Sequence, residues 1–229
     1  MSLGPLEKSK RLHESDPNYS LPSGYSEQGN IKSAMKLPWA LKSMCSKFTI
    51  QTFLDYGCGK NGLVSLLKSY KDFSSIDFRS YDPAIAEYAD KPSGGFDIVT
   101  CIDVLEHISR GEISQVLCEI SGLSRGFFFF AIDLVPAVKC LDDRRNAHIL
   151  LAPGDWWCQQ ISSQFTCTRF FQPGCFESGE KYPMHLFGWA TNSPNCQVMA
   201  NSFFDSIEIF SREWVCGSDN YKKVEFKKV

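Results

Sequence analysis

The residues best suited to chemistry by type and spacing form a glycine-rich stretch. In FLDYGCGKNGL, residues 53–63, three glycines follow directly on an apolar run: Gly57, Gly59 and Gly62. Glycine tolerates positive φ and lets a ligand approach the backbone, and a helix that begins just behind offers N–H groups to a polar or anionic group. The G-x-G-x-x-G spacing is typical of dinucleotide-binding turns. A tight turn that holds no ligand is the alternative interpretation.

An acidic side chain follows the next β-rich stretch. The segment SYDP places Asp82 at the separation from the glycines where an acidic residue meets the hydroxyls of a ribose. A carboxylate accepts two hydrogen bonds from a vicinal diol, which explains the residue type. The alternative is that Asp82 caps a short helix ahead of Pro83, and both roles can coexist.

Alternating strands and helices must position these residues. The predicted strands are 50–56, 75–82, 96–103 and 125–135, and the predicted helices are 31–48, 62–73, 109–124 and 152–165. This alternation predicts an α/β fold, Rossmann-like and doubly wound, with a mostly parallel sheet and helices on both faces. Less regular stretches at 166–171, 184–191 and 203–215 are candidate late strands, one of which we expect to be antiparallel.

Composition and organisation predict one globular domain. We expect residues 1–30 to form an N-terminal arm, and residues 31–229 a single domain with an N-terminal helical segment and an irregular C-terminal portion on the acceptor side. The 229 residues are 43% hydrophobic and 22% charged. The formal net charge of -2 gives no reason to propose nucleic acid. Without a secretory leader or an apolar run long enough to span a bilayer, we expect a cytoplasmic protein and no membrane partner.

The ten cysteines predict neither a metal site nor a disulfide framework. No pair has the two-residue spacing of a zinc knuckle or a redox motif. Several lie in apolar runs, where cysteine behaves as a small hydrophobic residue. We therefore expect reduced thiols and no metal.

Three motifs in order resemble the class I S-adenosylmethionine-dependent methyltransferases. LDYGCGKNG, YDP and FDIVTCIDVLEHI are similar to that family's first motif, second-strand acid and fourth-strand segment. DDRRNAH and PGDWW extend the resemblance more loosely to bacterial and phage members. The third glycine stands one place later than in the commoner G-x-G-x-G form. The resemblance implies S-adenosylmethionine as cofactor, bound by Asp55, Gly57, Cys58, Gly59, Gly62, Asp82, Pro83, Ile102, Asp103 and Val104.

Within that resemblance, Asp55 would orient the turn or meet the methionine amino group, and Asp82 would hold the ribose. The glycine turn would line the methionyl-ribose segment with backbone, and Pro83 would pack by the adenine. Residues 102–104 would lie beside the cofactor. The stretch EYADKPSGG, residues 87–95, contains no clear third strand, so the residue that contacts adenine stays open.

The candidate acceptor side lies after the fourth and fifth strands of the family. His107, in VLEHI, and His148, in DDRRNAHILL, are the candidate catalytic residues. Arg144, Arg145 and Asn146 are candidate substrate-binding residues, because arginine matches carboxylate and phosphate groups. The alternatives are a histidine that bonds the backbone and a solvated turn with ion pairs among Asp142, Asp143 and the arginines.

The predicted function is transfer of a methyl group from S-adenosylmethionine to an unidentified small-molecule acceptor. A catalytically silent nucleoside-binding module is one alternative. An NAD-dependent oxidoreductase is another, less favoured because no second mononucleotide-binding unit is visible and CIDVLEHI has no role in it. Neither the acceptor atom nor the oligomeric state follows from the sequence.

Overall fold

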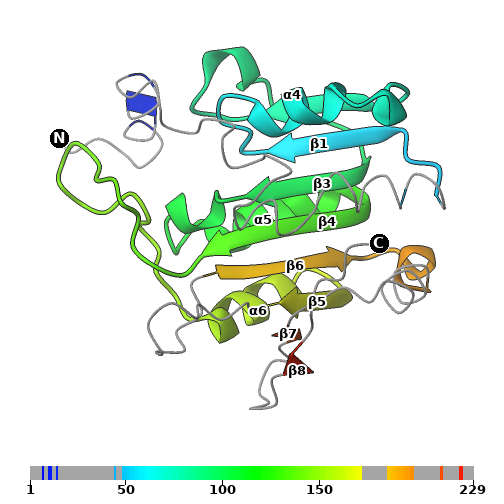
Figure 1. The fold of residues 1–229 in the computed structure, drawn as a ribbon. Helices are drawn as coiled ribbons and strands as arrows, with labels where there is room; N and C mark the ends of the chain where they lie inside the picture. Colours follow the sequence, from blue (N-terminus) through cyan, green and yellow to red (C-terminus); the bar gives the residue numbers. More distant parts are fainter. Residues whose placement is uncertain are drawn as a thin grey trace.

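The computed structural model describes residues 48–171, 185–198, 212–213 and 222–223, together with single helical residues at 7, 10, 11, 14 and 44. Most of the expected arm, most of the predicted 31–48 helix and most of the candidate 203–215 strand lie outside the described residues. The chain forms one sheet flanked by helices (Figure 1). Its strands are β1 (Thr52–Tyr56), β2 (Asp77–Tyr81), β3 (Phe96–Ile102), β4 (Ser124–Asp133), β5 (Cys167–Phe171), β6 (His185–Thr191), β7 (Arg212–Glu213) and β8 (Lys222–Lys223).

The strand order is β2-β1-β3-β4-β6-β5-β7-β8. The first four strands are mutually parallel, so their carboxyl ends meet at one edge of the sheet. β6 runs antiparallel to both β4 and β5, which is visible as the reversed arrow in Figure 1. The predicted doubly wound, mostly parallel sheet with an antiparallel late strand is therefore confirmed.

The phenylalanine run of β4 shows why the sheet is covered on both faces. Side chains of a strand alternate between the two faces, and both faces are apolar here. Phe127 and Phe129 belong to one buried cluster, while Phe128 and Phe130 belong to the other. A strand with one solvated face would show polar residues at every second position.

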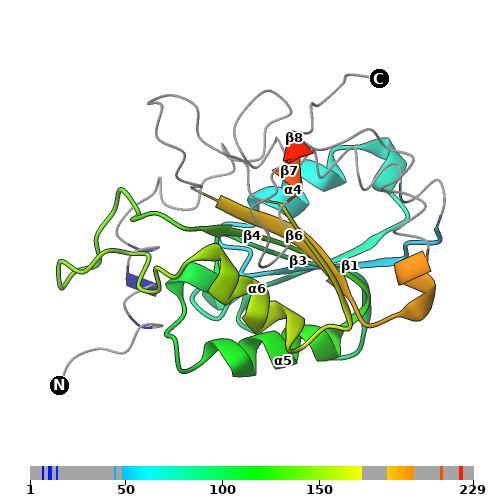
Figure 2. The same cartoon turned by 90° about the horizontal axis from the view of Figure 1, so that it is seen from below.

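The helices divide between those two clusters. α4 (Gly62–Lys68) contributes Leu63, Val64 and Leu67 to the cluster that contains Phe127. α5 (Ile113–Leu123) and α6 (Gly154–Ser162) cover the opposite face. Figure 2 shows α5 and α6 side by side on one side of the sheet and α4 on the other.

Three helical predictions differ in detail, and the helix expected over 152–165 is the shorter α6. The helix expected over 62–73 ends at Lys68, because the Ser69 N–H turns back to the Leu66 carbonyl, and a short 3-10 helix follows at Lys71–Phe73. The helix expected over 109–124 is the shorter α5. No strand forms over 87–95 in the described chain, which agrees with the absence of a clear third-strand pattern there.

None of the helices among the described residues has both the length and the apolar character needed to cross a bilayer. Among the cysteines of the described residues, Cys58, Cys101 and Cys158 are buried. Cys101 and Cys158 belong to the apolar cluster that contains Phe128, where cysteine behaves as a small hydrophobic residue.

Candidate functional site

The glycine stretch folds into a turn held against the end of β2. Gly57 and Gly59 have φ values of +81° and +51°, in the left-handed region that favours glycine. The N–H groups of Gly57 and Cys58 both donate to the Tyr81 carbonyl, at 2.7 and 3.1 Å. The turn is therefore fixed to the neighbouring strand by the backbone alone.

Asn61 explains the displaced third glycine. Its φ of +59° puts it in the left-handed region, at the position where the G-x-G-x-G form has its last glycine. Asparagine tolerates this conformation better than other side chains do. The Asn61 carboxamide accepts from Ser80 Oγ at 2.7 Å and donates to the Tyr88 hydroxyl at 3.3 Å, which ties the turn to the segment after β2.

Asp82 is buried, with 7% of its surface exposed, and joins the turn to the segment that follows β2. Its Oδ2 accepts from the Gly59 N–H at 2.9 Å and its Oδ1 accepts from the Ala84 N–H at 2.8 Å. The second bond is local but does not cap the following 3-10 helix, Ala86–Tyr88, whose N-cap is Ile85 and which has no side-chain cap hydrogen bond. The first brings the two predicted parts of the site together, across 23 residues of chain.

Asp55 is a buried acid at the end of β1. Its Oδ1 accepts from Thr100 Oγ1 of β3 at 2.8 Å, a partner that the sequence analysis missed. Burial raises the pKa of Asp55 to about 7; the Thr100 hydroxyl opposes the rise and the nearby charge of Asp82 adds to it. A carboxyl held this far from water gains from a cationic partner, so the site suits a ligand that carries an ammonium group.

Val104 packs directly against the turn. A Cβ built on Gly57 would lie 2.3 Å from Val104 Cγ2, so a side chain of the protein itself requires the glycine at this position. Asp103, the residue before it, has a φ of +54°, an uncommon value for a non-glycine residue. The end of β3 thus meets the glycine turn, with Ile102 buried in the core and Pro83 exposed after β2.

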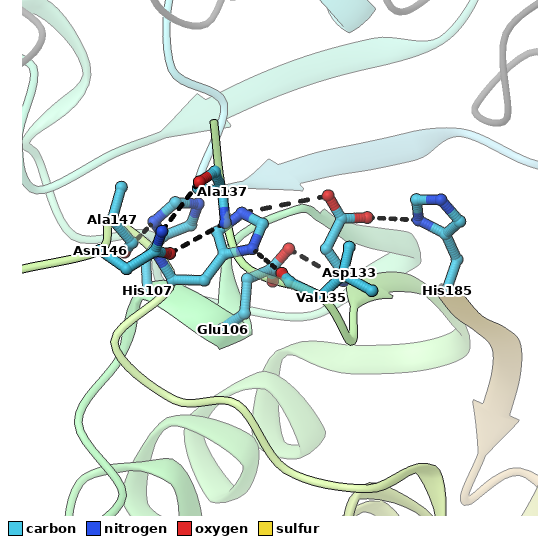
Figure 3. A network of polar contacts seen from close by, with 9 residues as sticks. Glu106, His107, Asp133, Val135, Ala137, Asn146, Ala147 and His185 are labelled. Carbon is cyan, nitrogen blue, oxygen red and sulfur yellow. Dashed lines mark hydrogen bonds and ion pairs between the residues drawn. The ribbon is translucent and has the colours of Figure 1, made fainter. Parts of the chain in front are cut away.

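A second group of polar residues lies where β3 and β4 end (Figure 3). His107 Nδ1 bonds the Ala147 carbonyl at 2.9 Å, and His148 Nδ1 bonds the Val135 carbonyl at 2.6 Å. The two imidazole rings meet edge to face, with centroids 4.9 Å apart. The structure therefore brings both candidate catalytic histidines together, although 41 positions separate them. The bond from His107 to the backbone was the alternative interpretation and is present as well.

Carboxylates that the sequence analysis left without a role complete this group. Glu106 is fully buried, and its Oε1 accepts from the Asp133 N–H at 3.0 Å. Asp133, the last residue of β4, pairs through Oδ1 with His185 Nδ1 at 2.5 Å and lies 3.9 Å through Oδ2 from His148 Nε2. Glu106 lies within the DVLEH segment, which the sequence had already marked as part of the site. Nothing in the sequence near Asp133 indicated its partners on β6 and in the loop.

The loop 137–148 contains the three candidate substrate-binding residues. Asn146 Oδ1 accepts from the N–H groups of Ala137 and His148, and its Nδ2 donates to the Ala137 carbonyl, all at 2.8–2.9 Å. Arg145 Nε pairs with Asp143 at 2.7 Å on the surface, as the ion-pair alternative supposed. Arg144 is exposed, with a φ of +66°. Their contact with an acceptor stays a prediction.

No protein-family model and no curated protein matches this sequence. Solved methyltransferase structures do match in fold. An N-methyltransferase of Haemonchus contortus with phosphomonomethylethanolamine and S-adenosylhomocysteine has a TM-score of 0.58 at 10% identity, over 84% of this chain and 61% of that one. The magnesium protoporphyrin IX methyltransferase ChlM of Synechocystis, with S-adenosylhomocysteine, has a TM-score of 0.54 at 11% identity, over 82% and 100%.

A third likeness is to the plantazolicin methyltransferase BamL, in complex with a triazolic desmethylPZN analogue and S-adenosylhomocysteine. Its TM-score is 0.51 at 15% identity, over 82% of this chain and 90% of that one. Together with the strand order and the reversed β6, these likenesses define the fold of this chain as that of the class I S-adenosylmethionine-dependent methyltransferases.

Proposed function

We propose that this protein binds S-adenosylmethionine and transfers its methyl group to a small-molecule acceptor. One observation carries the proposal: the turn at 57–61 and the buried Asp82 are joined by a 2.9 Å hydrogen bond at adjacent carboxyl ends of parallel strands. Ligands of open α/β sheets bind at these ends. The three solved methyltransferases described above contain S-adenosylhomocysteine, which supports the same ligand here.

The acidic residues of this edge fit the cofactor. Each Asp82 oxygen already accepts one backbone hydrogen bond and retains lone-pair capacity for a ribose hydroxyl. Asp55 is buried and has a raised pKa, so a nearby ammonium group such as that of methionine would stabilise its charged form. The turn at Gly57, Cys58, Gly59 and Gly62 would lie along the methionyl-ribose portion.

The bound cofactor supplies a methyl group attached to a positively charged sulfur. The chain must align the acceptor, exclude water and, for some acceptors, hold a proton. His107 and His148 are the residues we place nearest to that acceptor, with Arg144, Arg145 and Asn146 in the loop beside them. A small molecule is favoured because two of the structural neighbours were solved with small-molecule acceptors or analogues.

Turnover is the direct test. The full-length chain, incubated with methyl-labelled S-adenosylmethionine and fractionated pools of small metabolites, should transfer label to one fraction. Calorimetry with S-adenosylhomocysteine and with NAD, run in parallel, should show binding of the first and none of the second. Binding of NAD in preference to S-adenosylhomocysteine would overturn the cofactor assignment and favour the oxidoreductase alternative.

The silent binding module predicts a different pair of results. S-adenosylhomocysteine would bind, yet no pool would accept label, even when protein and peptide fractions are included. Because binding and turnover are measured separately, the two experiments distinguish a methyltransferase from a retained nucleoside pocket.

A further inference from the structure

The polar group where β3 and β4 end has the composition of a metal centre. Glu106, His107 and His148 each place one ligand atom within 4.8 Å of the other two. Glu106 shares a second such group with Asp103 and Asp133. Mixed imidazole and carboxylate groups at this spacing are the ligands that divalent transition metals take in proteins.

The hydrogen bonds of the two histidines fix which ring nitrogen can act as a ligand. A carbonyl oxygen only accepts, so His107 Nδ1 and His148 Nδ1 must carry hydrogen to bond the carbonyls of Ala147 and Val135. In the neutral rings, Nε2 then carries the lone pair. Metal-ligating histidines are held in this way, with the other ring nitrogen donating to a backbone carbonyl or a carboxylate.

The separation of His148 from Asp133 leaves room for a cation between them. His148 Nε2 and Asp133 Oδ2 lie 3.9 Å apart. Two metal bonds of about 2.1 Å each span up to about 4.2 Å, which covers the observed separation.

We propose that Glu106, His107 and His148 bind one divalent transition-metal ion, with Asp133 as a further oxygen ligand. This revises the expectation of no metal, which considered cysteine spacing alone. Fully buried Glu106 and 8% exposed His148 are held in place by backbone groups, so the site is preorganised. Mn²⁺, Co²⁺ and Zn²⁺ match the mixed nitrogen and oxygen ligand set.

The position of the site suggests its use, and this step rests on the proposed function. The metal ligands follow β3 and β4, whereas the glycine turn and Asp82 follow β1 and β2 at the same edge of the sheet. An ion there would coordinate an oxygen atom of the acceptor and orient it for methyl transfer. The acceptor class would then be an oxygen-bearing small molecule.

The first experiment measures metal binding without cofactor or acceptor. The full-length chain, stripped with EDTA and dialysed, is titrated with Co²⁺ and followed by visible absorption, then with Mn²⁺ by calorimetry. We expect one ion per chain, a visible cobalt band and a melting temperature that rises with metal concentration. Absence of the band together with an unchanged melting temperature at 1 mM metal would overturn the proposal.

Variants locate the ion. Loss of a residue that only supports a ligand costs about 10–100-fold in metal affinity, so His107→Ala and His148→Ala should each weaken Co²⁺ binding by at least about 100-fold. Asp77→Asn is the control. Asp77 is exposed at the amino end of β2, away from the proposed ligands at the carboxyl ends of the strands, so its substitution should leave the Co²⁺ affinity unchanged. Equal affinities of both histidine variants and the wild type would place the ion elsewhere and overturn the assignment.

Two features keep this test independent of methyl transfer. The cobalt band and the melting shift of the wild type need no variant, so they decide the question even if His148→Ala fails to fold. Metal binding without any turnover would support the site and count against the proposed function. Turnover by stripped protein that binds no metal would do the reverse.

Discussion

The two halves of the sheet edge are built differently. At the ends of β1 and β2, the site consists of a glycine-containing backbone turn that is hydrogen-bonded to Tyr81 and Asp82, with few side chains. At the ends of β3 and β4, it consists of histidines and carboxylates gathered from strand ends and a loop. Under the proposed function, the first half would hold the cofactor and the second half would contact the acceptor. The backbone half should therefore be the more sensitive to shape, and the side-chain half to charge.

The sharpest test of the backbone half is Gly57→Ala. A Cβ at this position would clash with Val104 at 2.3 Å, and the φ of +81° is unfavourable for alanine. Strain and overpacking together should lower the free energy of unfolding by about 2–5 kcal/mol. Gly122→Ala in α5 is the control, since nothing lies within 4 Å and the helix should gain about 0.5–1 kcal/mol. Equal effects in urea denaturation would show that the turn is not constrained as described.

The pH dependence of the free energy of unfolding tests the burial of Asp55. Its folded-state pKa is raised from 3.8 to about 7, so the folded chain keeps a proton that the unfolded chain loses. The free energy of unfolding should therefore fall as pH rises from about 4 to about 7, by about 3 kcal/mol between pH 5 and 8 at about 1.4 kcal/mol per pKa unit.

Asp55→Asn removes this titration and keeps an acceptor for the Thr100 hydroxyl. The variant should gain stability relative to the wild type as pH rises, and denaturant unfolding at pH 5 and pH 8 measures the change. A difference between variant and wild type that stays constant across these pH values would mean that Asp55 titrates normally.

The backbone half was predictable because its determinants are local. The strand that ends at Tyr56, the glycines that follow and the acid after the next strand lie within 30 residues, and each is a residue type with few alternative uses. The expected parallel arrangement then brings Gly59 and Asp82 together. The displaced third glycine also follows from local chemistry once Asn61 is seen in the left-handed region.

The side-chain half was predictable only in part. His107 and His148 were selected from the sequence, but their contact depends on how the loop 137–148 folds back, which Asn146 fixes through backbone bonds. Asp133 and His185 meet because β6 pairs antiparallel with β4 in one register, and registers are not readable from strand patterns alone. The burial of Glu106 was likewise not predictable, because glutamate usually lies on the surface and only the folded structure shows its neighbours.

Asp82→Ala should change the S-adenosylhomocysteine affinity of the backbone half without changing the metal affinity of the side-chain half. It removes a charged acceptor from the proposed ribose contact and should weaken S-adenosylhomocysteine binding by about 1.5–3 kcal/mol. Calorimetry on protein shown to be folded measures this, and Asp82→Asn should fall between alanine and the wild type. Metal affinity at the other half should stay unchanged. An unaltered S-adenosylhomocysteine affinity in Asp82→Ala would remove Asp82 from the cofactor site.

The smallest effect concerns the loop that supports the side-chain half. The three hydrogen bonds of half-buried Asn146 close the loop onto Ala137 and hold the His148 backbone, so Asn146→Ala should cost about 1–2 kcal/mol of unfolding free energy. Arg145→Ala is the matched control, because its exposed ion pair with Asp143 should contribute about 0–1 kcal/mol. Co²⁺ affinity should fall in Asn146→Ala and stay constant in Arg145→Ala. If Arg145→Ala instead weakened metal binding while Asn146→Ala did not, the loop would act through its charge and not through the position it gives His148.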